Sequence, residues 1–365
     1  MQTEIIIIAT LSSIACVIPG IFLLLKRMAL ISDAISHSIL PGIVIGFFVR
    51  QSLNTPYPII GAIIFAMIMV VTSEAITRTN LVKEDTAIAL VFPPLFSIGV
   101  ILVSLFAGNV HLDTDAVLLG ELAFAPFERV AFLGTTVPKS MIKMAIIVVI
   151  NLIVMILLFK ELKVSTFDPT LSNSLGFSPA FLHYLLMLMT SITAVGAFDS
   201  VGAILVLAFM ITPTATALLL TNSLFLMVII SFGLATVSSI GGVLLAMEID
   251  AGLSGSITTV MGLLFVLAFL FSPINGVVTK AKNQRKIKHE YALSIVLYHL
   301  MNHCDADDME SECSYGHLKE QFSYSYRYLQ KVVASAVDRD LVEEHDGVFH
   351  ITEKGMKATA FPYYK

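Results

Sequence analysis

Residues 27 to 42 read Arg-Met-Ala-Leu-Ile-Ser-Asp-Ala-Ile-Ser-His-Ser-Ile-Leu-Pro-Gly, and this largely apolar stretch places Asp33 and His37 four positions apart. On a helix, residues i and i+4 share one face, so the carboxylate and the imidazole can converge on a single ion. Ionisable side chains at membrane depth are costly, and they usually face a bundle interior or a polar pathway. The pair is therefore the first candidate for a functional site. The alternative is that His37 only packs between helices, with Asp33 as its partner.

The composition places this stretch in a membrane protein. Hydrophobic residues make up 56% of the chain and charged residues 13%, and apolar stretches recur up to about residue 280. Because lipid cannot satisfy open backbone groups, stretches of this length must be helices. We predict an all-α polytopic membrane protein with eight or nine transmembrane helices, and residues 198–202 decide between the two numbers. The candidate spans are residues 5–25, 29–49, 57–77, 86–107, 141–159, 180–198, 201–220, 223–247 and 253–273.

The basic residues of the short loops predict the orientation. With nine spans, these residues all fall on one side, which the excess of positive charge identifies as cytoplasmic. The N-terminus is then outside and the C-terminus inside. The residues that set this orientation are Lys26, Arg27, Arg78, Lys83, Lys160, Lys163, Lys280, Lys282, Arg285, Lys286 and Lys288.

Several blocks in a fixed order resemble a known family. The stretch from Arg27 to Gly42 is similar to the signature of the permease subunits of bacterial metal-ion ABC importers, which take up manganese, zinc or iron. Further blocks resemble that family in the same order along about 280 residues. They are Lys83-Glu-Asp-Thr-Ala-Ile-Ala-Leu-Val-Phe92, Phe167-Asp-Pro-Thr-Leu-Ser-Asn-Ser-Leu-Gly176, Leu182-His-Tyr-Leu-Leu-Met187 and the segment from Val201 to Thr216.

The resemblance implies a role for the Asp33 and His37 pair. In the family, the matching pair lines the metal pathway at the interface between two permease subunits. Mixed oxygen and nitrogen ligands suit Mn²⁺, Fe²⁺ and Zn²⁺, so ligand type does not choose among them. The amino-acid sequence of this stretch is more similar to manganese and iron permeases than to zinc permeases. The metal is expected as a transported ion, and no tightly bound cofactor is expected.

The loop from Lys160 to Pro179 resembles the family's coupling element, which sits in a groove of the ATPase subunit. Asp168 and Pro169 suit the N-cap and first position of a helix, and Gly176 suits its end. The alternative is a simple loop between two spans. The expected coupling residues are Phe167, Asp168, Pro169, Leu171, Leu175 and Gly176.

The chain lacks a recognisable nucleotide-binding motif. The nearest segment, Gly134-Thr-Thr-Val-Pro-Lys-Ser140, has no glycine before the lysine. We therefore expect a chain that is not itself an enzyme and that works with separate ATP-binding subunits. The resemblance further implies a second permease subunit, identical or paralogous, and an extracytoplasmic metal-binding lipoprotein. The expected location is the lipid of a bacterial plasma membrane.

The composition changes after the last span. We predict a permease domain over residues 1–280, a basic linker over 281–288 and a cytoplasmic domain over 289–365. Three helical patterns are followed by alternating residues around Asp346-Gly347, a strong signal for a β-hairpin. This small α+β domain resembles a winged helix-turn-helix of bacterial metalloregulators. From His289 onward seven Lys and Arg stand against thirteen Asp and Glu, which disfavours binding to DNA and favours a regulatory or interaction role.

Two further hypotheses concern this tail. Cys and His residues crowd one acidic loop, and they could hold a regulatory metal, although their spacing fits no standard zinc template and a solvated loop is the alternative. The tail also keeps open a different class of function, a membrane-anchored metal-responsive transcriptional regulator. An ATP-independent carrier is the other alternative. The candidate regulatory ligands are His303, Cys304, Cys313 and His317.

Overall fold

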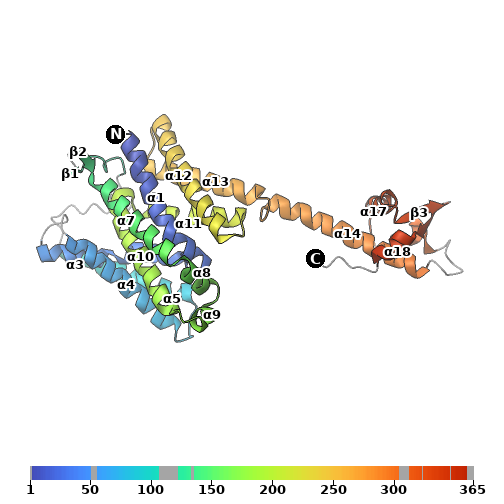
Figure 1. Cartoon of the computed structure of the whole chain (residues 1–365), viewed down its shortest axis with the longest axis horizontal. Coiled ribbons are helices and arrows are strands. Elements are labelled where there is room, and N and C mark those ends of the chain that lie inside the picture. Colours follow the sequence, from blue (N-terminus) through green and yellow to red (C-terminus); the bar gives the residue numbers. More distant parts are fainter. Residues whose placement is uncertain are drawn as a thin grey trace. The chain divides into compact units, whose positions relative to one another are not determined.

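The computed structural model divides the chain into two compact units, Met1–Gly276 and Val277–Lys365. Helices dominate both units, as Figure 1 shows. The structure describes residues 2–50, 56–106, 122–132, 135–303, 312–322, 324–345 and 347–359.

The first unit is the all-α polytopic membrane domain predicted from the apolar stretches. Among the described residues, nine helical segments are long and apolar enough to cross a membrane, and each overlaps one predicted span. A short antiparallel hairpin of β1 (Arg129–Phe132) and β2 (Thr135–Pro138) is the β-structure described in this unit. The helices are α1 (Gln2–Leu25), α2 (Ala29–Ser38), α3 (Leu40–Arg50), α4 (Pro56–Thr77), α5 (Glu84–Phe106), α7 (Lys139–Leu157), α8 (Phe159–Phe167), α9 (Pro169–Ser174), α10 (Pro179–Val201), α11 (Ala203–Leu220), α12 (Leu224–Ile249) and α13 (Leu253–Phe271).

Helix α1 runs through the centre of this bundle. It packs against α7, α10, α11 and α12, and residues along its length such as Ile8 and Phe22 are fully buried. The Asn151 amide on α7 donates to the Ala15 carbonyl at 3.2 Å and to the Thr193 hydroxyl at 2.8 Å. Such interhelical hydrogen bonds hold helices together in lipid, where apolar burial alone gives no preference for protein contacts. One side chain therefore ties α1, α7 and α10 together.

The two ends of the bundle carry different elements. The β1–β2 hairpin lies beside the N-terminal end of α1, where Arg129 pairs with Glu4 at 2.5 Å. Helices α8 and α9 lie at the opposite end, as Figure 1 shows. At that end α1 closes with Arg27 at φ +63°, and the Met28 N–H donates to the Leu23 carbonyl at 2.9 Å. This is the hydrogen bond of a Schellman helix end, and it turns the chain directly into α2.

The stretch from Arg27 to Gly42 forms a broken helix rather than a continuous one. Pro41 has no N–H to donate to the carbonyl of His37, so α2 ends at Ser38 and α3 begins at Leu40. Gly42 then packs against Gly61 of α4 so closely that a Cβ built on Gly42 would lie 2.1 Å from the Gly61 carbonyl oxygen. The Pro-Gly end of the stretch thus interrupts the helix and allows α3 and α4 to touch through their backbones.

The second unit has the predicted order of helices followed by a hairpin. In the hairpin His345 pairs with Val348, and Gly347 has φ +81°. Its core contains Leu297, Val333 and Phe349. The elements are α14 (Val277–His303), α16 (Tyr315–Phe322), α17 (Tyr326–Asp338), β3 (Val342–His345), β4 (Val348–Ile351) and α18 (Glu353–Thr359). The unit is a small α+β domain, as predicted.

The boundary between the units differs slightly from the predicted one. It falls at Gly276 rather than near residue 280, and residues 281–288, which we expected to form a separate linker, lie inside α14. Lys, Arg, Gln and Ala form helices readily, so this basic segment is part of the first helix of the second unit.

Candidate functional site

Asp33 and His37 lie on one face of α2, as the four-residue spacing predicts. The His37 Nε2 atom is 3.5 Å from the Asp33 Oδ1 atom, and the two side chains are 31% and 39% exposed. Neither side chain is sealed inside the membrane unit. The pair therefore presents one imidazole nitrogen and one carboxylate group to a partner or to solvent.

Aromatic side chains of α5 border the pair. The ring of His37 stacks on Phe92 with centroids 6.0 Å apart and meets the edge of Phe96 at 5.7 Å. Packing of α2 against α5 fixes the imidazole in this way. The hydroxyls of Ser32 and Ser36 donate to carbonyls of their own helix, so they are already engaged. The rigid, partly apolar setting leaves Asp33 and His37 as the groups with metal-ligand chemistry on this face.

Two side chains are too few to complete the shell of a transition metal, which takes four to six ligands. Within the parts of the chain that the structure describes, no group of three or more His, Cys, Asp and Glu residues is placed to hold a metal ion. An ion at Asp33 and His37 would therefore need further ligands from water or from another chain. This arrangement fits a path at an interface better than a permanent metal site.

The expected coupling element forms a short helix with both ends capped. The Asp168 carboxylate accepts a hydrogen bond from the Leu171 N–H at 2.9 Å, and Pro169 occupies the first position of α9. At the other end Gly176 has φ +86°, and the Phe177 N–H donates to the Ser172 carbonyl at 3.1 Å. The predicted N-cap and glycine stop are thus confirmed, and a simple loop is excluded.

An apolar face of this element points away from the bundle. Phe167, Leu171 and Leu175 are 62%, 48% and 56% exposed. Leu171 lies on α9, whereas Phe167 ends α8 and Leu175 directly follows α9, so the three flank and cover one short element. Exposed apolar residues gathered at one end of a bundle are typical of a protein contact. The element therefore has the shape and surface of a docking helix.

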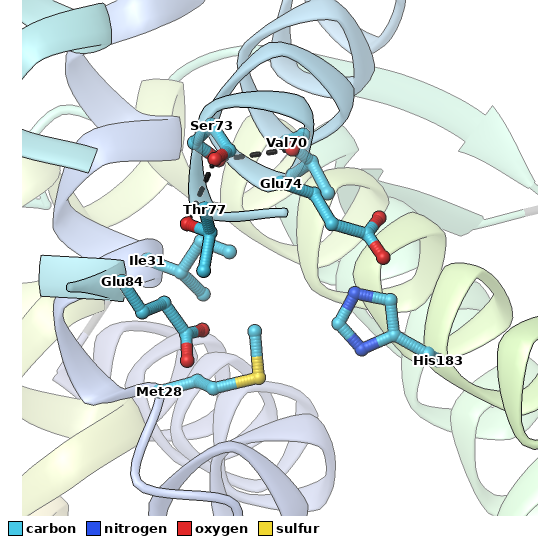
Figure 2. Close-up of a pocket in the computed structure, with 8 residues that line it drawn as sticks. All are labelled: Met28, Ile31, Val70, Ser73, Glu74, Thr77, Glu84 and His183. Carbon is cyan, nitrogen blue, oxygen red and sulfur yellow. Dashed lines mark hydrogen bonds between the residues drawn. The ribbon is translucent and has the colours of Figure 1, made fainter. Parts of the chain in front are cut away.

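A polar cavity lies at the same end of the bundle. Its volume is about 180 Å³, and it is lined by residues from α2, α4, α5 and α10. Figure 2 shows the Glu74 carboxylate and the His183 imidazole pointing toward one another, with Glu84 and Met28 on the facing wall. Nearby, burial lowers the pKa of Lys26 below its usual range, and the negative charge of Glu84 opposes this shift.

Glu74 is held by side chains from two helices. Its Oε2 atom accepts a hydrogen bond from the Tyr184 hydroxyl at 2.5 Å, and its Oε1 atom accepts one from the Arg78 guanidinium at 2.8 Å. No role of Glu74 or His183 was predicted from the sequence. The available signal was that both are ionisable residues inside predicted spans, a feature that usually marks function.

The candidate regulatory ligands of the second unit are only partly described. Cys304 lies outside the described residues, and of His303 the structure describes only the backbone at the end of α14. Cys313 is buried. His317 stacks on His299, with ring centroids 5.6 Å apart and Phe322 against the edge of His299. His299 was not among the predicted residues, because a buried histidine on an apolar helix face gives no distinct sequence signal.

Fold and site together define a polytopic membrane protein with a partly exposed Asp–His pair on one helix and a short capped helix whose apolar side chains are exposed. The family is established by comparison: the chain belongs to the ABC 3 transport family, whose model matches residues 1–272. This range ends before α14, so the family match covers the membrane unit.

Two relatives and one solved structure show how far the similarity extends. The zinc transport system membrane protein TroD of Treponema pallidum is 47% identical, over 98% of this chain and 97% of its own length. The manganese transport system membrane protein MntD of Bacillus subtilis is 40% identical over 80% of this chain and all of its own length. The structure of PsaBC from Streptococcus pneumoniae in complex with Fab matches with a TM-score of 0.62 and 28% identity, over 75% of this chain and 92% of that chain. The resemblance to metal-ion ABC permeases is thereby confirmed.

Proposed function

We propose that this chain is the permease subunit of an ABC importer for a divalent transition metal, and that the metal passes Asp33 and His37. A separate ATPase drives the transport. One observation carries the proposal: a carboxylate and an imidazole lie 3.5 Å apart on a partly exposed face of a membrane-spanning segment. Such groups are expensive at membrane depth and are kept where they bind or move ions.

The chemistry at the pair follows from its two ligands. A divalent ion that leaves water must regain ligands, and Asp33 supplies a negative charge while neutral His37 supplies a nitrogen. The partial exposure of both side chains makes them accessible to a second permease subunit, identical or paralogous, that faces α2. Remaining ligands come from that subunit or from retained water. The ion is cargo, and no tightly bound cofactor is proposed.

We propose that the ATPase subunit acts on this chain through α9 and the residues that flank it. The apolar residues Phe167, Leu171 and Leu175 are exposed as a docking surface requires, and we assign them to the groove of a cytoplasmic ATPase subunit. The end of the bundle that holds α8 and α9 is then cytoplasmic, and the opposite end receives metal from an extracytoplasmic binding lipoprotein. In this orientation the second unit lies in the cytoplasm of a bacterium whose plasma membrane holds the chain.

Ligand chemistry suits manganese, iron and zinc alike. The amino-acid sequence from Arg27 to Gly42 favours manganese or iron. The relative with 47% identity is named as a zinc transport protein, and the relative with 40% identity as a manganese transport protein. Both names describe transport systems, which favours transport over a membrane-anchored regulator. We propose a regulatory role for the second unit, through metal sensing or contact with the ATPase, and His303, Cys304, Cys313 and His317 stay its predicted ligands.

Reconstitution tests this function directly. The chain is co-expressed with a candidate ATP-binding subunit and the second permease subunit, purified as a complex and placed in liposomes with the metal-loaded binding protein. The proposal expects ATP-dependent entry of radiolabelled Mn²⁺, Fe²⁺ or Zn²⁺, with competition among the three ranking them. Entry that is independent of ATP would favour a carrier. A complex that hydrolyses ATP but moves none of the three metals would refute the proposal.

A further inference from the structure

Glu74 joins two helices that are distant in sequence. It lies on α4, and its Oε2 atom accepts the hydrogen bond from the Tyr184 hydroxyl of α10, 110 positions along the chain. The Arg78 guanidinium, directly after the end of α4, donates to the other carboxylate oxygen at 2.8 Å. A carboxylate held on both oxygens has one defined orientation. The bond between Tyr184 and Glu74 is therefore a directional contact between α4 and α10.

Tyr184 is close in sequence to the docking helix. Only Leu175 to Ser178 separate α9 from α10, and this connection is itself held by hydrogen bonds. The Ser178 hydroxyl caps α10 by accepting from the Phe181 N–H at 3.3 Å, and α9 and α8 both pack against α10. Because α9 and the start of α10 are firmly connected, a displacement of α9 reaches Tyr184 directly.

The cavity beside this bond gives the helices room to move. A partly open pocket of about 180 Å³ lies between α2, α4, α5 and α10, so these helices are not packed tightly against one another there. Met28 and Ile31 of α2 form one wall, and His183 of α10 reaches in from another (Figure 2). Helix α2 also carries Asp33 and His37, so the cavity lies between the docking side of the bundle and the helix that binds the ion.

We propose that the hydrogen bond between Tyr184 and Glu74 links the docking helix to the ion-binding helix, so that movement of α9 changes the position of α2 relative to α4. This inference rests on the proposed function and adds a pair of positioning residues to it. Neither residue touches the metal or the ATPase. Their role is to couple ATP hydrolysis to metal transport. Without the hydrogen bond between them, the ATPase hydrolyses ATP but little metal is transported.

The test uses the reconstituted complex and measures metal ions transported per ATP hydrolysed. Tyr184→Phe keeps the ring and removes the hydroxyl. We expect the ATPase to copurify in normal amount and its basal hydrolysis to stay unchanged, while the transport ratio falls by about tenfold, as for the loss of a hydrogen bond to a charged group. An unchanged ratio in Tyr184→Phe would overturn the inference.

Three further variants separate the link from general damage. Glu74→Leu should lose at least as much as Tyr184→Phe, because it also removes the acceptor of Arg78, and the double variant should be no worse than Glu74→Leu alone, because the bond with Tyr184 is shared. Glu74→Gln keeps an acceptor for the Tyr184 hydroxyl and should stay close to wild type. The matched control is Ser73→Ala, which removes another hydroxyl from the cavity wall, one that bonds only within α4, to the Val70 carbonyl.

The outcomes are distinguishable from failure of the proposed function. If the wild-type complex moves no metal with ATP, the proposed function is wrong, whatever the variants do. If the wild type transports and Ser73→Ala loses as much coupling as Tyr184→Phe, the cavity is sensitive to any change and the specific link is refuted. Additive losses in the double variant would refute it as well.

Discussion

Gly42 of α3 and Gly61 of α4 contact each other through their backbones. A Cβ on Gly42 would lie 2.1 Å from the Gly61 carbonyl oxygen, and a Cβ on Gly61 would lie 2.1 Å from the Gly42 carbonyl oxygen. No side chain larger than hydrogen fits at either position without moving a helix. The contact fixes α3 against α4 directly after the segment that carries Asp33 and His37.

We predict that Gly42→Ala destabilises the protein by about 1 to 3 kcal/mol, the usual range for overpacking. The measurement is the thermal unfolding midpoint of the purified protein in detergent. Gly262→Ala on α13 is the matched control, because a Cβ there meets nothing within 4 Å. The control should be neutral or slightly stabilising, since alanine favours helix over glycine. Equal midpoints for both variants would contradict the tight contact.

Charge on the exposed face of α9 should release the ATPase. We predict that Leu171→Asp greatly reduces the amount of ATP-binding subunit that copurifies, because a carboxylate cannot be desolvated in an apolar groove without cost. Asn173→Asp adds the same charge on another side of the helix and serves as the control. Full recovery of the ATPase with Leu171→Asp would show that this face is not the docking surface.

The cap of α9 has a separate, smaller effect. Asp168→Ala removes the acceptor of the Leu171 N–H and should cost about 1 kcal/mol of local helix stability. Hydrogen exchange followed by mass spectrometry should detect faster exchange in residues 169–175, with α10 unaffected. Unchanged protection in this segment would contradict the capping role.

The second unit contains an ion pair with a definite dependence on pH. Arg339 binds Glu290 through two hydrogen bonds of 2.9 and 2.8 Å, and this bonding holds the pKa of Glu290 below its ordinary value. A depressed carboxyl pKa stabilises the fold above the ordinary pKa of glutamate, and this contribution is lost as the pH falls through the lowered value. Because the pair is partly exposed, it contributes no more than about 1 kcal/mol.

Comparison of the wild type with Glu290→Gln measures this contribution. At neutral pH, amides of α17 in the wild type should be better protected from hydrogen exchange than in Glu290→Gln. The difference should shrink as the pH falls below the ordinary range of a glutamate. A difference that persisted in strong acid would mean that the stabilisation does not depend on the charge of Glu290.

Removal of residues 289–365 should leave transport intact. The membrane unit has its own core, and the family match ends at residue 272. Uptake by truncated and full-length protein is compared in metal-starved and metal-loaded cells. We expect both to transport and only the full-length chain to respond to internal metal. Identical responses would leave the tail without this regulatory role, and loss of all uptake would place it in the transport machinery.

The sequence predicted the features that depend on local pattern. Apolar length identified the spans, the Asp168-Pro169 pair and Gly176 marked the ends of α9, and Asp346-Gly347 predicted the hairpin. Each of these signals acts over a few residues. The contact of Glu74 with Tyr184 could not be predicted in this way, because it depends on how α4 and α10 pack in three dimensions. The same holds for the stacking of His299 on His317.

The interruption of the helix between Ser38 and Leu40 was not predicted from the sequence. Pro41 was visible, yet residues 29–49 read as one span because their apolar content is continuous. The length and polarity of a segment decide whether it crosses a membrane, whereas one missing N–H decides whether the helix is interrupted. The position of Asp33 and His37 just before the interruption at Ile39 became evident only from the folded chain.

Uptake by variants of Asp33 and His37 tests whether the metal passes these two residues. Radiolabelled Mn²⁺, Fe²⁺ and Zn²⁺ are supplied to the reconstituted complex carrying Asp33→Ala or His37→Ala, with assembly checked by copurification of the ATPase. We predict that both variants assemble and insert but lose uptake of the transported metal, and that Asp33→Glu, which keeps the charge, loses less. Near-normal uptake of that metal by both alanine variants would contradict the claim.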